Sequence, residues 1–201
     1  MRALWVDAGN DPDYVKAKEH GITALYFALD DPRVRASYLT SVQHKGFAVG
    51  VYVASSWLAF QGDGTTFAEK VSEMVKIVTG SPTTPATFPK VQLDMEQHDS
   101  EFIVDCLERW RELRPKQDTS WTMEPFQAGW MSNELVATVI AKKVRVVPQY
   151  YFGDMSPAAA DRCVLTLIAR GFPPALITGF YDAAALPGRW DGFAFTQGRL
   201  P

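Results

Sequence analysis

Short apolar runs alternate along the chain with longer stretches in which apolar residues recur every three or four positions. The short runs have the length and composition of buried β-strands, and the longer stretches have the periodicity of amphipathic helices. The pattern predicts strands at residues 3–7, 24–29, 48–54, 90–96, 119–124, 145–150, 176–181 and 192–196. It predicts helices at residues 12–20, 34–44, 66–79, 100–113, 132–142 and 156–170.

Strands that alternate with helices predict an α/β fold with a parallel sheet, and eight parallel strands are the number that closes a barrel. A chain of 201 residues is short for this architecture, and residues 182–190 are too few for a full helix. We therefore expect a single domain, residues 1–201, that folds as a small irregular (β/α)8 TIM barrel whose last helices are short or missing. An open doubly wound sheet is the alternative. The first strand-to-helix turn, Asp7-Ala-Gly-Asn-Asp-Pro12, lacks the glycine-rich phosphate fingerprint of that class.

Composition narrows the range of partners. The net charge is −3 and no basic run is present, so we expect no nucleic-acid partner. No apolar stretch approaches the ~20 residues of a membrane span, and the N-terminus lacks the pattern of a secretory signal. We expect synthesis in the cytoplasm without a signal peptide, which is compatible with later release by lysis or incorporation into a virion. Cys106 and Cys163 fall on apolar helix positions and are expected to be buried free thiols.

Asp94 and Glu96 carry the most specific chemical signal in the sequence. Residues two apart on a strand project from the same face, so both carboxyls are expected on one side of the strand at 90–96. An acidic pair suits the cleavage of a glycosidic bond, because one carboxyl protonates the leaving oxygen and the other stabilises or attacks the developing cation. Two close carboxylates also repel, which raises the proton affinity of one of them. A D-x-E triplet also arises by chance at solvated strand ends.

Other predicted strands also end in polar residues, and in a barrel these ends meet at one rim. We expect Glu96 to act as general acid and Asp94 to stabilise the positive centre or to position an acetamido group. Asp7 and Asp182 are expected to flank this pair as catalytic residues. Glu124 is expected either to contact the substrate or to support a residue that does. The other predicted substrate-binding residues are Gln149, Tyr150, Tyr52, Trp57, Trp130, Tyr181 and Gln197, of which the aromatic ones could instead belong to the core.

We expect no cofactor and no metal site. The chain has three histidines, and His20 and His44 fall in helix-end sequence, which leaves little support for a histidine metal site or a Ser-His-Asp triad. The acidic rim could bind Mg²⁺ or Ca²⁺, although no acid-rich ligand loop is present. A metal-dependent hydrolase is therefore kept as an alternative.

Four segments in order along the chain are Leu4-Trp-Val-Asp7, Gly46-Phe-Ala-Val-Gly-Val-Tyr52, Leu93-Asp-Met-Glu96 and Phe195-Thr-Gln197. Together they resemble the family 25 glycoside hydrolases, the lysozymes of bacteria and bacteriophages, and related glycoside-hydrolase-like domains. The resemblance implies a small irregular β/α barrel that cleaves the β-1,4 bond between N-acetylmuramic acid and N-acetylglucosamine. It matches Glu96 to the proton donor, Asp94 to its partner and Asp7 to the first-strand acid. The sequence departs from the family at Phe27-Ala-Leu-Asp-Asp31, at Val53-Ala-Ser-Ser56 and at Glu124.

The expected function is thus a glycosidase, lysozyme-like or muramidase-like, that acts on peptidoglycan or a related cell-wall polysaccharide. This activity would suit a phage-encoded enzyme. The alternative is a non-catalytic glycan-binding or structural barrel, such as a minor tail protein of a phage. Its partners would then include other virion or tail proteins.

Overall fold

The computed structural model describes residues 2–54, 62–80, 89–95, 98–149, 157–178, 180–182 and 192–195, with backbone alone at 157–160, 180–182 and 192–195. The strands are β1 (Arg2–Val6), β2 (Ala24–Ala28), β3 (Ala48–Ala54), β4 (Lys90–Asp94), β5 (Thr119–Met123), β6 (Arg145–Pro148), β7 (Phe180–Asp182) and β8 (Gly192–Phe195). The helices are α1 (Tyr14–Glu19), α2 (Ala36–His44), α3 (Gly64–Thr79), α4 (Ser100–Leu113), α5 (Gln127–Trp130), α6 (Asn133–Ala141), α7 (Pro157–Ala169) and the 3₁₀ turn η1 (Pro174–Leu176).

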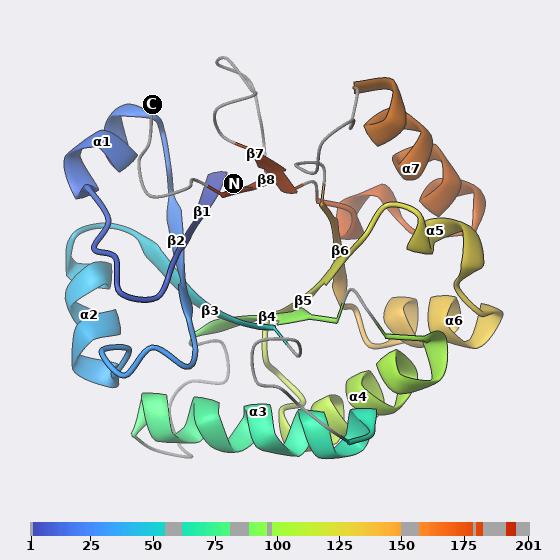
Figure 1. Ribbon diagram of the computed structural model, residues 1–201, viewed down its shortest axis with the longest axis horizontal. Helices are drawn as coiled ribbons and strands as arrows, with labels where there is room; N and C mark the ends of the chain where they lie inside the picture. Colours follow the sequence, from blue (N-terminus) through green and yellow to red (C-terminus); the bar gives the residue numbers. More distant parts are fainter. Residues whose placement is uncertain are drawn as a thin grey trace.

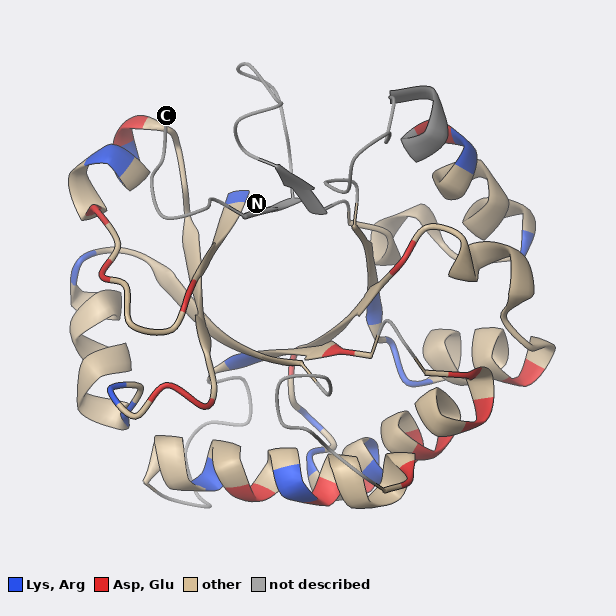
Figure 2. Ribbon diagram, viewed as in Figure 1, with Lys and Arg blue, Asp and Glu red and all other residues tan. Residues whose placement is uncertain are grey.

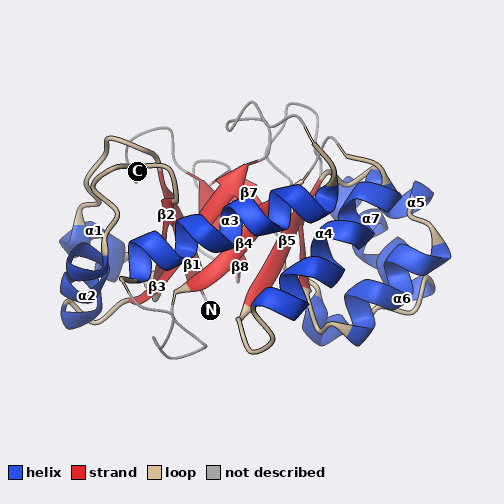
Figure 3. Cartoon of the chain, turned by 90° about the horizontal axis from the view of Figure 1, so that it is seen from below, coloured by secondary structure: helices blue, strands red, loops and turns tan. Residues whose placement is uncertain are grey.

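All strand pairings are parallel, and β1 to β6 lie side by side in sequence order as a curled half-barrel. β8 pairs with the other edge of β1, and β7 pairs with β8. Viewed along its shortest axis, the sheet forms a ring with the helices outside it (Figure 1). In the view turned by 90°, the strands lie behind and between the helices that surround them (Figure 3). The predicted α/β fold with a parallel sheet is confirmed.

The barrel is incomplete between β6 and β7. Among the described residues these two strands share no ladder, and an isolated bridge lies at this gap, between Val146 of β6 and Ile177, which precedes β7. The N–H of Thr178 donates to the carbonyl of Val146 at 2.9 Å. The predicted strand at 176–181 begins too early, because Pro174 starts the 3₁₀ turn η1 there. Leu176 is the last residue of this turn, and the strand β7 begins at Phe180.

Acidic and hydroxyl side chains begin four of the helices. The side chains of Asp13, Asp63, Asp99 and Ser132 accept backbone N–H groups in the first turns of α1, α3, α4 and α6. These contacts satisfy N–H groups that have no partner inside a helix. Each helix therefore starts at a defined residue after its strand-to-helix loop, which fixes where each loop ends.

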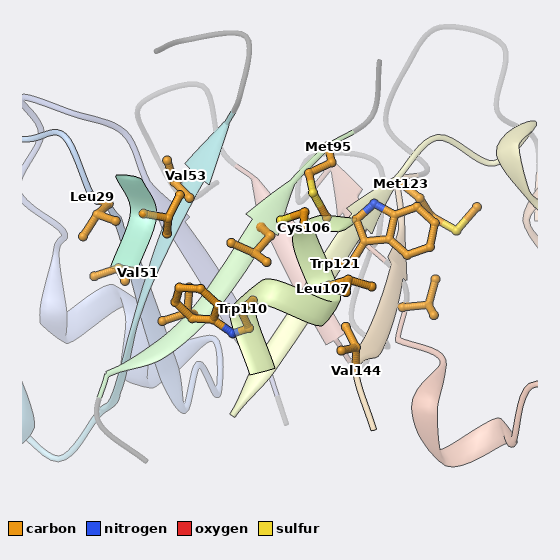
Figure 4. Packing of buried hydrophobic residues seen from close by; sticks show 14 of the residues in the cluster. Leu29, Val51, Val53, Met95, Cys106, Leu107, Trp110, Trp121, Met123 and Val144 are labelled. Atoms are coloured by element: carbon orange, nitrogen blue, oxygen red, sulfur yellow. The ribbon is translucent and has the colours of Figure 1, made fainter. Parts of the chain in front are cut away.

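The outward face of the sheet packs against the helices. Val51, Val53 and Met95 lie in the same layer as Cys106 and Trp110 of α4 (Figure 4). The indole N–H of Trp110 donates to the Thr119 hydroxyl at 2.9 Å. Cys106 and Cys163 are buried and neither is in a disulfide, as predicted. No helix in the described ranges has the length and apolar character needed to cross a bilayer.

The inward face forms a separate buried cluster, which includes Trp5, Tyr26 and Tyr52. Trp5 stacks on Tyr52, and its indole N–H donates to Gln92 Oε1 at 2.5 Å. The ring of Tyr26 covers Gly50, where a Cβ would lie 2.3 Å from the nearest ring atom. Glycine is therefore needed at residue 50 so that the tyrosine can lie across β3. The interior of the ring is filled by side chains, as in other β/α barrels.

Candidate functional site

Three of the predicted acids lie at the C-terminal ends of their strands. Asp7 follows the last residue of β1, Asp94 is the last residue of β4, and Glu124 follows the last residue of β5. Each is two residues beyond an inward-facing side chain, so it continues the inward face of its strand. Acidic positions occur on the ring as well as on the outer helices (Figure 2). The structure thus brings Asp7, Asp94 and Glu124 to the inner side of one rim.

The electrostatics of Tyr52 support this grouping. Burial raises the pKa of the Tyr52 phenol well above its usual range, and the nearby carboxylates of Asp7, Asp30 and Asp94 raise it further. The Tyr52 hydroxyl donates to the carbonyl of Val6 at 3.2 Å. Acids from β1, β2 and β4 therefore lie around one buried hydroxyl just below the rim.

Two of the rim carboxyls hold their protons more tightly than usual. Burial raises the pKa of Asp7 and also that of Glu124. In both cases the low-polarity surroundings disfavour the charged form. A carboxyl that stays protonated to higher pH is suited to donate a proton to a leaving group. Asp7 and Glu124 are therefore suited to a proton-donating role.

Glu124 is held by a turn that sequence reasoning missed. Its N–H donates to Gln127 Oε1 at 2.7 Å, and the N–H of Gln127 donates back to the Glu124 carbonyl at 3.0 Å. Pro125 occupies the second position of this turn, which leads into α5. A glutamine three residues after Glu124, at the start of a short helix, has the spacing of half a capping box, in which the glutamine side chain accepts the N–H three residues earlier. That signal could have identified the turn.

The end of β4 is tied to the same turn. Gln127 is fully buried, and its Nε2 donates to the carbonyl of His98 at 3.5 Å. The N–H of His98 donates to the Met95 carbonyl at 3.4 Å, and its ring stacks on Phe102 with centroids 3.6 Å apart. Burial lowers the pKa of His98. Through Gln127, the exits of β4 and β5 form one connected unit.

Tyr52 and Gln149 are fully buried beneath the rim. The N–H of Gln149 donates to the Met123 carbonyl at 2.9 Å, so this residue extends the pairing of β5 and β6. Both side chains support the rim from below, and their contact with substrate stays a prediction. Trp130 differs, because it ends α5 with 42% of its surface exposed, close in sequence to Phe126 at 62%.

The remaining predicted residues lie either in β7 or outside the described residues. Asp182 and Tyr181 lie in β7, which is described by its backbone, and Asp182 is in register with Phe195 of β8. Phe195 is in turn in register with Trp5 of β1. The other predictions fall outside the described residues, and these are Glu96, Trp57, Tyr150 and Gln197.

The structure offers two further observations on ligands. Over the described ranges, no group of three or more His, Cys, Asp or Glu side chains is arranged to hold a metal ion. A groove of about 770 Å³ lies outside the ring, between the turn after β2 and the C-terminal half of α3. The described residues that line it include Leu29, Val34 and Ile77 and none of the predicted site residues. The groove is thus separate from the rim.

No family model matches the chain, and a search of curated proteins returned no relative. Solved structures are similar over nearly the whole chain. A chain described as an α-L-fucosidase from Bacteroides thetaiotaomicron has a TM-score of 0.56 and 10% identity, with 96% of this chain and 84% of that chain covered. A GH10 endoxylanase from a sugarcane soil metagenome has a TM-score of 0.53 and 9% identity, covering 94% and 72%. A chain described as a fructose-1,6-biphosphate aldolase from Coccidioides immitis has a TM-score of 0.55 and 8% identity, covering 98% and 72%.

The chain has a TIM-barrel-like fold. At identities of 8 to 10%, the likeness shows the fold alone. The fold is one that glycoside hydrolases use, and it also occurs in the aldolase-like chain. None of these three structures is a lysozyme, so activity has to be argued from the rim itself.

Proposed function

We propose that this protein is a glycosidase that cleaves β-1,4 bonds of peptidoglycan or a related cell-wall polysaccharide by acid catalysis with paired carboxyls. The observation that carries the proposal is that Asp7, Asp94 and Glu124 all continue the inward faces of their strands at one rim. Acids at the C-terminal ends of several strands are typical of catalytic sites in β/α barrels. The xylanase and the fucosidase-like chain are described as acting on sugars, which supports the same class of substrate.

The proposed roles follow from sequence and burial together. Glu96 is proposed as the proton donor and Asp94 as the partner that stabilises the developing positive charge. Asp94 is buried, with 8% of its surface exposed, so its charge acts in surroundings of low polarity. Asp7 is proposed to hold a sugar hydroxyl or the attacking water. Its raised pKa suits Asp7 to share a proton with the sugar hydroxyl or with the attacking water.

The test is a digest of purified peptidoglycan, in which new reducing ends are measured against time. Asp94→Asn and Glu96→Gln are each expected to lower the rate by about 10² to 10⁴-fold, the usual contribution of a positioned acid or base. Glu101→Gln is the matched control, because Glu101 is an exposed acid in the first turn of α4. Parental rates in both Asp94→Asn and Glu96→Gln, with the fold intact by circular dichroism, would refute the proposal.

A non-catalytic glycan-binding barrel, such as a minor tail protein of a phage, is the second candidate. It is favoured by the exposure of Phe126 and Trp130 beside the exit of β5. Aromatic faces bind sugar C–H surfaces whether or not hydrolysis follows. Retention of the protein on wall glycans, with no reducing ends released at any pH from acidic to neutral, would select this candidate over the enzyme.

A further inference from the structure

Gln127 joins two rim segments that the proposed chemistry needs in a fixed relation. Its Oε1 accepts from the N–H of Glu124 at 2.7 Å, and its Nε2 donates to the carbonyl of His98 at 3.5 Å. His98 lies two residues beyond Glu96 in the sequence. One side chain therefore contacts the backbone at two neighbouring points of the rim, at the exit of β5 and just after the exit of β4.

The chemistry of the amide explains why glutamine suits this position. The side chain is fully buried, so each polar atom that lost its partner would cost free energy. Glutamine presents an acceptor and a donor at once, and the two backbone groups require one of each. A neutral carboxylic acid can do the same, because its carbonyl oxygen accepts and its hydroxyl donates. An ionised carboxylate only accepts.

In the described part of the chain, the backbone hydrogen bonds of Glu124 are those with Gln127. β5 ends at Met123, and the Met123 carbonyl is taken by the N–H of Gln149. The backbone of Glu124 is then oriented by its two hydrogen bonds with Gln127. A change at Gln127 would thus move the Glu124 carboxyl without touching it directly.

We propose that Gln127 is a positioning residue whose amide fixes the Glu124 carboxyl against the end of β4, so that Glu124 acts together with Asp94 on the substrate. This inference rests on the proposed glycosidase function. The reacting groups stay those of the rim, and Gln127 itself does not contact the substrate. Misplacing a group by about 1 Å can cost about 10²-fold in rate, which is the expected scale of the effect.

The experiment compares Gln127→Met, Gln127→Glu and a control, Gln117→Met, in the full chain. Gln127→Met keeps the length of the side chain and removes both hydrogen bonds. Gln117 is the matched control, because it is also buried and its amide donates to a backbone carbonyl, that of Pro89, at the other end of β4. Two quantities are measured for each variant: kcat and KM on peptidoglycan fragments between acidic and neutral pH, and the pKa of Glu124 by NMR of its labelled carboxyl.

Gln127→Met is expected to lower kcat by about 10²-fold with little change in KM, and to move the pKa of Glu124 toward its ordinary value. Gln127→Glu is expected to keep most of the activity while the new carboxyl is neutral and to lose it as that carboxyl ionises. This adds one ionisation to the pH profile, which a purely structural role would not do. Gln117→Met is expected to leave kcat and the pKa of Glu124 unchanged.

The outcomes separate the two proposals. An inactive parent protein overturns the glycosidase function. In that case the pKa of Glu124 in Gln127→Met tests the positioning role by itself: a shift of this pKa supports the role, and no shift overturns it. An active parent with unchanged kcat and unchanged Glu124 pKa in Gln127→Met overturns the positioning role. If Gln127→Met does not fold, Gln127→Glu decides, and a pH profile identical to that of the parent overturns the role.

Discussion

Trp5 and Tyr52 stack face to face inside the ring, with centroids 4.0 Å apart and planes 4° from parallel. The residue of β3 in register with Trp5, through Tyr26 of β2, is Gly50. Tyr52 is therefore two residues further along, over two strands. This is the stagger of one residue per strand that an eight-stranded barrel of shear eight requires. The stack shows that the sheet has barrel geometry although the ring is incomplete.

The same stagger relates the acids of the rim. Ala28, Tyr52, Gln92 and Ser120 follow one another in register across β2 to β5, and Asp7 extends this row from β1. Advancing one residue per strand over four strands leads from Ser120 to Glu124. Asp7 and Glu124 are thus level at the rim, on opposite sides of the ring. Burial raises the pKa of both carboxyls.

Tyr52→Phe is expected to lower the free energy of unfolding by about 1 kcal/mol, because it removes the hydroxyl that donates to Val6 and keeps the ring stack. Trp5→Ala is expected to lower the free energy of unfolding by about 3 to 5 kcal/mol, because it leaves a cavity and removes the indole N–H that donates to Gln92 Oε1. Urea unfolding at neutral pH measures both. Equal losses in the two variants would contradict this division between hydroxyl and ring.

Thr122 on β5 differs from Tyr52 in the hydrogen bonding of its hydroxyl. Its hydroxyl is fully buried on the inward face and has no hydrogen-bond partner among the described residues. Thr122→Val replaces the hydroxyl with a methyl of similar size, so we expect the free energy of unfolding to rise by up to about 1 kcal/mol. The measurement is thermal unfolding with calorimetry.

Thr119 on the outward face of the same strand is the control for that substitution. Its hydroxyl accepts from the Trp110 indole at 2.9 Å and donates to the Gln117 carbonyl at 3.0 Å. Thr119→Val is therefore expected to destabilise the protein by about 1 to 3 kcal/mol. Destabilisation of similar size in Thr122→Val would show that its hydroxyl does have a partner in solution.

The sequence predicts most of this fold because the strands are short apolar runs that stand out between longer amphipathic stretches. The predicted helix at 100–113 coincides with α4, and the predicted strand at 48–54 coincides with β3. The four-residue helix α5 and the 3₁₀ turn η1 were not predicted, because neither is long enough to show a period. The incomplete closure at Val146 and Ile177 depends on contacts between segments far apart, which no local pattern encodes.

The site was predictable in part for the same reason. The period of two along a strand is enough to place Asp7, Asp94 and Glu124 on the inward face. It does not indicate how deep a side chain lies, so Tyr52 and Gln149 were expected at the surface of the site and are buried. Gln127 was missed because its role depends on His98, a residue of another strand exit brought near by the pairing of β4 and β5.

Asp7→Asn is expected to stabilise the protein at neutral pH and to have little effect in acid. Burial raises the pKa of folded Asp7 above its ordinary value of 3.8, so the folded state binds the proton more tightly than the unfolded state. Stability is then lost as pH rises from 3.8 through the raised pKa, and asparagine removes this loss. Urea unfolding at several pH values checks it. A benefit that is as large at pH 3 as at pH 7 would show that the effect is not electrostatic.

Asp31→Asn is expected to show the reverse dependence. The Arg33 guanidinium and the N–H of Gly9 hold the pKa of Asp31 well below its usual range, with Arg33 at 2.7 Å and Gly9 at 2.9 Å. The ionised carboxylate therefore stabilises the folded state above pH 3.8, and this contribution disappears as pH falls through the lowered pKa. We expect the free energy of unfolding of the variant to be lower by about 1 kcal/mol at pH 7, a small loss because Arg33 is partly exposed and its charge is screened. In strong acid we expect this loss to become progressively smaller. A loss that does not shrink in acid would mean that Asp31 acts through the shape of its loop and not through its charge.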